Sequence, residues 1–184
     1  MRIGLFLPHV SVFGGVRRYL ELGNEWVALG HDVTLFHPDG GPPTWLPFTG
    51  LTARLADAAA LESDVAICGD RDTYPAFRSH RAARHVFYCV LESDPALPAA
   101  LADAGVTLMA NSGPLRRTLE RKSRRAVLDG VGGIRPERFR PAATGRPASP
   151  LRVLVYGRRS RRRKGTDLVL RALAGLVGCV PEFE

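Results

Sequence analysis

Short runs of consecutive apolar residues, each followed by a helical pattern, most constrain the fold of this chain. The first run covers residues 2–8 and alternates little, which is typical of a strand buried on both faces of a parallel sheet. Apolar residues then recur at helical spacing from Val16 to Leu29, and Gly30 supplies a C-terminal stop. The pattern therefore predicts a strand, a helix and a second strand over 32–37.

The same rhythm continues through the first 140 residues. A loop rich in Pro and Gly over 38–50 is followed by strand and helix patterns. We expect a short helix near 55–61, strands over 64–68, 85–91 and 106–110, a helix over 95–104, and a helix carrying Leu115 and Leu119. Asn111 or Ser112 is placed to cap that last helix through its side chain. Such alternation predicts an α/β fold, a Rossmann-like doubly wound parallel sheet covered on both faces.

A change of composition predicts two domains. Residues 135–150 hold Pro136, Pro141, Pro147 and Pro150 and few large apolar groups, as linkers do. We expect a first domain over 1–140, a linker over 141–150 and the start of a second domain over 151–184. That start comprises a strand over 151–156, a basic loop over 157–165 and a helix over 166–177.

The predicted second domain is too small to stand alone. One strand and one helix cannot bury their own apolar faces, and an unpaired strand edge invites another chain. We therefore expect residues 151–184 to dock on the first domain or to form a homodimer through the exposed C-terminal strand.

The net charge indicates which classes of partner to expect, and the cysteines indicate the compartment. A formal charge of +8 and a pI of about 10.2 favour anionic partners, namely phosphorylated ligands, nucleic acid or an acidic membrane surface, although an arginine-rich composition explains the same numbers. The three cysteines, Cys68, Cys89 and Cys179, sit in or beside apolar runs without metal-ligand spacing. They predict buried reduced thiols in a cytoplasmic protein, with no metal site. No segment approaches the roughly 20 apolar residues that span a bilayer.

The first candidate site is the glycine pair in HVSVFGGV, between the first strand and the first helix. Gly14 and Gly15 would let the backbone approach a ligand, and the helix N-terminus offers amides to an anion. The loop is not GxGxxG, and His37 and Pro38 stand where a dinucleotide site carries an acidic residue. The alternative is a tight turn that needs glycine only for packing.

The second candidate is Glu92, which follows the strand predicted over 85–91. Open α/β sheets bind ligands at the carboxyl ends of their strands, where this side chain falls. For the neighbouring Ser93 and Asp94, the alternative role is N-cap of the next helix.

Four segments together resemble family 4 retaining glycosyltransferases, which have the GT-B fold. They are the GGV start of the first helix, LMANSGPLRRTL, GGIRPERFRP and VLVYGRRSRRRKG. The third is similar to the family's Gly-Val-Asp-x-x-x-Phe-x-Pro linker, except that Arg135 replaces the aspartate. FYCVLESDP also resembles the segment that places a polar residue at the cleft, where the more common histidine is absent. The fourth is similar to the Gly-Arg-x(n)-Lys-Gly segment that opens the nucleotide-binding domain.

The resemblance implies transfer of a sugar, with retention, from a nucleoside diphosphate sugar to a hydroxyl of a glycan, a lipid-linked acceptor or a small molecule. Arg158 and Lys164 would bind the diphosphate and neutralise the charge that develops on it, so neither a metal nor a cofactor is required. Gly14 and Gly15 would border the donor phosphate, and Glu92 would face the acceptor. The catalytic candidates are thus Glu92, Arg158 and Lys164.

The family's second domain continues with more strands and two glutamates eight positions apart, whereas Glu182 and Glu184 match neither their spacing nor their place. We therefore expect this chain to be a truncated and inactive part of the enzyme. Two alternatives stay open: a non-catalytic module that binds an acceptor or partner, and a basic nucleic-acid-associated protein, against which the absence of interleaved aromatics argues. A further basic cluster favours a solvated helix face, with peripheral contact with the inner membrane surface as the alternative; it comprises Arg116, Arg117, Arg121, Lys122, Arg124 and Arg125.

Overall fold

The computed structural model describes residues 1–133, 139–140, 153–155, 157 and 165–176. The chain divides after Gly133 into two units, 1–133 and 134–184, and each unit is described by itself. The linker predicted over 141–150 lies outside the described residues, and the predicted domain boundary at residue 140 stays a prediction.

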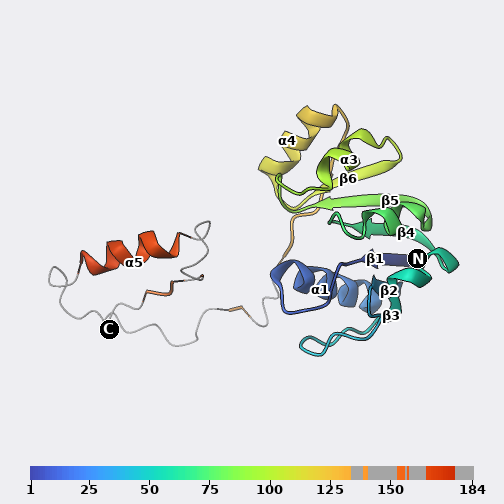
Figure 1. The fold of residues 1–184 in the computed structure, drawn as a ribbon, viewed down its shortest axis with the longest axis horizontal. Coiled ribbons are helices and arrows are strands. Elements are labelled where there is room, and N and C mark those ends of the chain that lie inside the picture. Colours follow the sequence, from blue (N-terminus) through green and yellow to red (C-terminus); the bar gives the residue numbers. More distant parts are fainter. Residues whose placement is uncertain (134–138, 141–152, 156, 158–164, 177–184) are drawn as a thin grey trace. The chain divides into compact units, whose positions relative to one another are not determined.

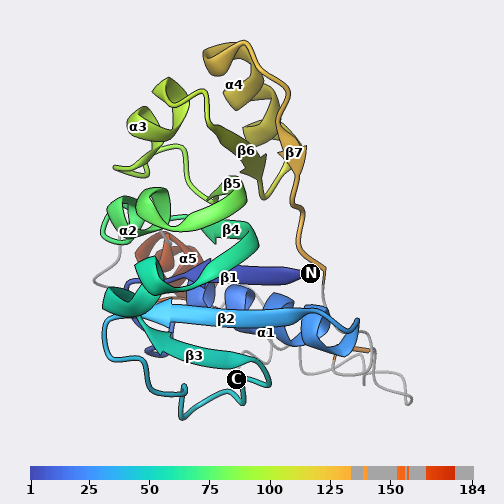
Figure 2. The ribbon, with the colours of Figure 1, turned by 90° about the vertical axis from the view of Figure 1, so that its right-hand side faces the viewer.

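The first unit is built on a seven-stranded sheet in which every recorded strand pair is parallel. The strand order is β3-β2-β1-β4-β5-β6-β7, and Figure 2 shows β3 at one end of the sheet and β7 at the other. The strands are β1 (Arg2–Phe6), β2 (Asp32–His37), β3 (Leu51–Arg54), β4 (Glu62–Cys68), β5 (Arg81–Cys89), β6 (Val106–Ala110) and β7 (Leu128–Asp129). This arrangement confirms the predicted α/β fold with a Rossmann-like parallel sheet.

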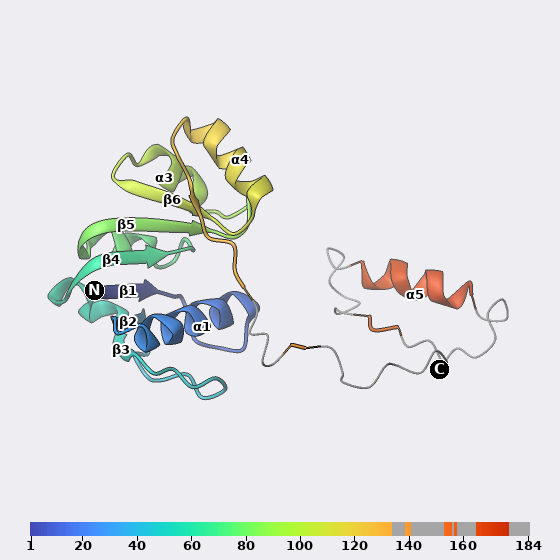
Figure 3. The same cartoon turned by 180° about the vertical axis from the view of Figure 1, so that it is seen from behind.

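Side chains of β1 alternate between two separate cores, one on each face of the sheet. Ile3 and Leu5 pack in the core that α1 (Gly14–Ala28) closes with Val16 and Leu20, while Phe6 packs in the opposite core. Figure 3 shows α1 lying along β1 and β2. The opposite core is closed by η1 (Leu55–Ala60), α2 (Tyr74–Ser79), α3 (Leu97–Ala102) and α4 (Gly113–Ser123). Apolar side chains on both faces explain why the strands read as continuous apolar runs.

Several element predictions need correction. β3, α2 and β7 were not predicted, and the helix expected over 55–61 is a 3-10 helix. β5 begins at Arg81, four residues before the predicted start, because the charged residues of its first half are exposed and carry no apolar signal. There Arg81 pairs with Glu62 of β4, with 2.8 Å between Arg81 Nη2 and Glu62 Oε1.

The helix caps also differ from the prediction. Ser112 is the N-cap residue of α4, as its position indicated, but its side chain makes no capping hydrogen bond. The N-cap of α3 is Ala96 rather than Ser93 or Asp94, and Asp94 Oδ1 instead accepts a hydrogen bond from the backbone N–H of Ala96 at 2.8 Å. Asp94 therefore stabilises the turn that leads into α3.

The second unit contains α5 (Thr166–Ala174), which appears in red in Figure 1 and lies within the helix predicted over 166–177. Gly165 precedes it with φ of +65°, a backbone conformation that glycine adopts without strain. The strand predicted over 151–156 is wrong for the described part, 153–155, which is not in a strand. An extended segment becomes a strand only through ladder hydrogen bonds to a neighbour, and Leu154 is 94% exposed.

Candidate functional site

The order of the strands reverses between β1 and β4. From β1 the chain adds β2 and β3 on one side and then returns to add β4 through β7 on the other. Open α/β sheets bind ligands outside the carboxyl ends of their strands at such a reversal. The residues that reach this edge follow β1, β4 and β5, and they form the candidate site.

Gly14 and Gly15 are the first two residues of α1, directly after the loop that leaves β1. The N-cap residue Phe13 gives no side-chain hydrogen bond, and no acidic residue lies in the first turn, so no side chain of the helix itself neutralises its positive end. A Cβ on Gly14 would meet nothing within 4 Å, and one on Gly15 only Phe13 Cδ1 at 3.9 Å. Packing therefore does not explain the glycine pair, and the space beside it is open.

Glu92 lies in the loop after β5, at the carboxyl edge as predicted, but it already has a partner. Its Oε1 accepts a hydrogen bond from Lys122 Nζ at 2.7 Å, and both side chains are about half exposed, 53% and 47%. The hydrogen bond and charge of Lys122 lower the pKa of Glu92. The carboxylate is thus ionised and held toward α4.

The sequence did not single out Asp70, which follows β4. Its carboxylate accepts hydrogen bonds from the N–H and the hydroxyl of Thr73, at 2.9 and 2.7 Å. Burial raises the pKa of Asp70 and also that of Asp94, and the negative charge of Asp70 raises the pKa of Asp94 further. The charge of one partly buried carboxylate thus affects a second one beyond the end of the neighbouring strand.

Tyr19 of α1 lies beneath this edge with its hydroxyl buried and without a hydrogen-bond partner among the described residues. Burial raises the pKa of Tyr19, and electrostatic interactions with the nearby Cys68 and Asp70 raise it further. Gly69 admits this packing, because a Cβ there would collide with Tyr19 Oη and lie 2.6 Å from the carbonyl oxygen of Tyr88. A glycine directly after a strand was the only available sequence signal for this contact.

The thiols at this edge are buried and unpaired, as predicted. Cys68 and Cys89 end β4 and β5 as free cysteines, and burial raises their pKa values to about 12 and about 11. Both are therefore protonated and unreactive at neutral pH. Cys179 lies outside the described residues.

Arg158 and Lys164 also lie outside the described residues, so their positions relative to the glycine pair stay predictions. The glycines that flank their segment are described. Gly157 has φ of +137° and Gly165 has φ of +65°, so both adopt backbone conformations that L side chains rarely take.

The basic cluster predicted on and after α4 is smaller than expected. Arg125 is turned inward and donates four hydrogen bonds to carbonyl oxygens. Lys122 pairs with Glu92, and Arg116 lies 3.9 Å from Glu120. Ion pairs to described acidic residues are recorded for none of the remaining three, Arg117, Arg121 and Arg124.

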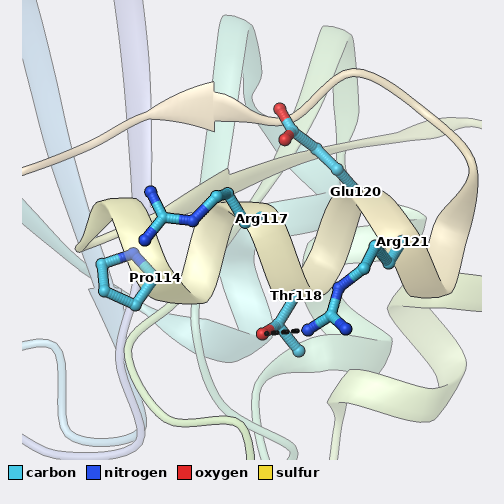
Figure 4. Close-up of a pocket in the computed structure, with 5 residues that line it drawn as sticks. All are labelled: Pro114, Arg117, Thr118, Glu120 and Arg121. Carbon is cyan, nitrogen blue, oxygen red and sulfur yellow. Dashed lines mark hydrogen bonds between the residues drawn. The ribbon is translucent and has the colours of Figure 1, made fainter.

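Two of these three arginines line a surface hollow along α4 (Figure 4), together with Pro114, Thr118 and Glu120. Arg121 Nη2 donates to Thr118 Oγ1 at 3.3 Å, and Arg117 extends back over the first turn toward Pro114. Arg117 follows the first turn of α4, where the helix dipole has its positive end, whereas Arg121 lies in the last turn.

Neither the family models nor the curated proteins compared with this chain include a match. Within the described ranges, no group of three or more His, Cys, Asp or Glu side chains could hold a metal ion. The same residues contain no helix long and apolar enough to cross a membrane.

Proposed function

We propose that this chain is the acceptor-side part of a retaining glycosyltransferase. The reaction transfers a sugar from a nucleoside diphosphate sugar to a hydroxyl of a glycan, a lipid-linked acceptor or a small molecule. One observation carries the proposal: the N-cap residue of α1 makes no side-chain capping hydrogen bond, and the helix begins with two glycines that face open space after the loop that leaves β1. Such a terminus is suited to a phosphate group.

In this proposal the glycine pair and the basic segment 157–165 both bind the diphosphate. Gly14 and Gly15 border its phosphates, while Arg158 and Lys164 form charge-assisted hydrogen bonds with it. The same two cations stabilise the negative charge that grows on the diphosphate as the sugar leaves. Because these two cations neutralise the charge on the diphosphate, as a bound metal ion would, the proposed reaction needs no metal or cofactor.

Glu92 faces the acceptor in this proposal. It must then exchange its hydrogen bond with Lys122 for one with an acceptor hydroxyl. The cost is small because exposed ion pairs contribute little to stability, and the exposed fractions of Glu92 and Lys122 are 53% and 47%.

We assign the reaction to the cytoplasm, where the free thiols of Cys68 and Cys89 would persist. Arg117 and Arg121 of the α4 hollow, which form no ion pair with a described acidic residue, would support peripheral contact with an anionic inner membrane surface. A homodimer through the residues after 150 stays part of the proposal.

Calorimetry of the whole chain with UDP, GDP and ADP tests the donor site. Arg158→Ala and Lys164→Ala should each weaken binding of the preferred diphosphate about tenfold to a hundredfold, since a lost charged hydrogen bond costs about 1.5–3 kcal/mol. Arg161→Ala is the matched control from the same basic loop and should bind like the wild type. Failure of all three diphosphates to bind would count against the proposal. Binding of duplex DNA with a steep salt dependence would favour the nucleic-acid alternative.

A further inference from the structure

The segment that follows β7 is held at its first residue by backbone and side-chain hydrogen bonds. The N–H of Gly130 donates to the carbonyl oxygen of Ala110 at 2.8 Å, and the carbonyl oxygen of Gly130 accepts from Tyr88 Oη at 2.7 Å. Both polar backbone groups of Gly130 are therefore bonded, although the two-residue β7 strand has already ended.

Arg18 of α1 completes this arrangement from the other side. Its guanidinium donates to Tyr88 Oη and lies over the Tyr88 ring, with 5.7 Å between Arg18 Cζ and the ring centroid. Tyr88 itself is 1% exposed, so its hydroxyl has a fixed position. One hydrogen-bond chain thus joins α1, β5 and the segment after β7.

The glycines of this segment fit around the same two side chains. A Cβ on Gly130 would lie 2.8 Å from the Tyr88 ring and 2.7 Å from Met109 Cγ, and one on Gly132 would collide with the Arg18 guanidinium. Neither glycine has a positive φ, so close approach rather than backbone conformation favours glycine here: Gly130 lies against the buried Tyr88 ring, and Gly132 against the end of the Arg18 side chain. Gly133 differs, because a Cβ there would meet nothing within 4 Å.

We propose that Arg18 and Tyr88 form an exit clamp, which makes residues 130–132 part of the rigid first unit and fixes, beside α1, the point where the chain leaves it. Both are positioning residues. The clamp gives a physical reason for Gly130 and Gly132, which neither the sheet nor the proposed donor site explains. The inference does not depend on the proposed function.

The energetics favour a stable clamp. The Arg18 bond is charge-assisted and about twice as strong as a neutral hydrogen bond. Tyr88 both accepts and donates, and bonds in such chains strengthen one another. Loss of the Tyr88 hydroxyl would leave the Gly130 carbonyl oxygen without this donor and would free the Arg18 guanidinium.

Backbone ¹⁵N relaxation and amide exchange of the whole chain test the clamp. In the wild type, heteronuclear NOE values of residues 130–132 should equal those of β5 and β6. Tyr88→Phe keeps the ring but removes both hydrogen bonds, so the NOE of Val131 and Gly132 should fall and exchange of the Gly130 amide should accelerate tenfold or more. Arg17→Ala is the matched control, because Arg17 pairs with Glu21 instead, with 3.0 Å between Arg17 Nη2 and Glu21 Oε1. This variant should leave the NOE values of residues 130–132 unchanged.

A second variant separates the clamp from the stability of the core. Gly132→Ala leaves Tyr88 and Arg18 intact but places a methyl group against the guanidinium, and it should mobilise the same segment while exchange in β4 and β5 stays at wild-type rates. Wild-type NOE values at 131–132 below those of the sheet would overturn the inference. Unchanged values in both Tyr88→Phe and Gly132→Ala would overturn it equally.

Discussion

Arg125 Nη2 donates a hydrogen bond of 3.1 Å to the carbonyl oxygen of Ala100, near the end of α3. The same guanidinium also reaches the carbonyl oxygens of Leu101, Asp103 and Val106, at 3.1, 2.9 and 3.1 Å. The last carbonyl groups of a helix have no intrahelical hydrogen-bond donor. Here the guanidinium of Arg125 donates to two such carbonyls at the end of α3 and to two that follow it. Arg125 therefore connects the segment after α4 to the end of α3 and the start of β6.

Removal of this guanidinium should destabilise the first unit. Arg125→Ala removes one donor from each of four carbonyl oxygens, and hydrogen bonds to charged groups contribute about 1.5–3 kcal/mol each without being additive. We expect the free energy of unfolding to fall by about 2–3 kcal/mol in urea titrations.

The neighbouring Arg124 provides a control, because its replacement should not lower the free energy of unfolding. It is exposed and adopts φ of +54° as the C-cap of α4, a conformation that costs an L residue about 1–2 kcal/mol. Arg124→Gly should therefore leave stability unchanged or raise it. An equal loss of stability in both variants would show that Arg125 has no special role.

Gly69 should tolerate no side chain. In Gly69→Ala the new methyl group would overlap Tyr19 Oη and the carbonyl oxygen of Tyr88, and overpacking of a core costs about 1–3 kcal/mol. Gly14→Ala is the matched variant, since its methyl group would meet nothing within 4 Å. Because alanine favours a helix over glycine by about 0.5–1 kcal/mol, Gly14→Ala should not lower the melting temperature. A fall for Gly14→Ala as large as that for Gly69→Ala would contradict the described packing.

The two buried thiols should resist alkylation. With Cys179 replaced by serine, Cys68 and Cys89 should not react with iodoacetamide at pH 8 in the folded protein, since the thiolate is the nucleophile and their pKa values are about 12 and about 11. Both should react in concentrated urea, as mass spectrometry would record. Rapid reaction of the folded protein would mean that these thiols are exposed.

The same pKa shifts predict a pH dependence of stability. A thiol whose pKa is raised by folding contributes stability fully below its unfolded value, about 8.5, and loses that contribution as the pH rises through the folded value. The free energy of unfolding of the wild type should therefore fall between about pH 9 and 12. A Cys68→Ser and Cys89→Ser double variant should show a smaller fall, whereas an identical fall would assign the effect to other groups.

The sequence predicts the buried strands well because burial on both faces leaves a plain apolar signal. β1 and β2 are examples, and the helical spacing between them predicts α1. β3 and the first half of β5 carry no such signal, since Leu51 is exposed and the early residues of β5 are charged. Arg125 binds carbonyl groups that only the folded backbone brings together. The sequence shows only one more arginine among basic residues, and it was therefore predicted as part of the basic cluster.

The candidate site was only partly predictable. Spacing placed Gly14, Gly15 and Glu92 after the correct strands, because a motif directly after a strand of a parallel sheet must lie at its carboxyl edge. Spacing could not reveal the Lys122 partner of Glu92, thirty residues away, or the buried hydroxyl of Tyr19.

Amide shift mapping with a nucleoside diphosphate most directly tests the central claim, that the glycine pair and the basic segment bind one sugar diphosphate. ¹⁵N-labelled chain titrated with the preferred diphosphate should shift the amides of Gly14 and Gly15 together with those of Arg158 and Lys164, all with one dissociation constant. Shifts confined to α4, or shifts of the two segments with different constants, would contradict the account.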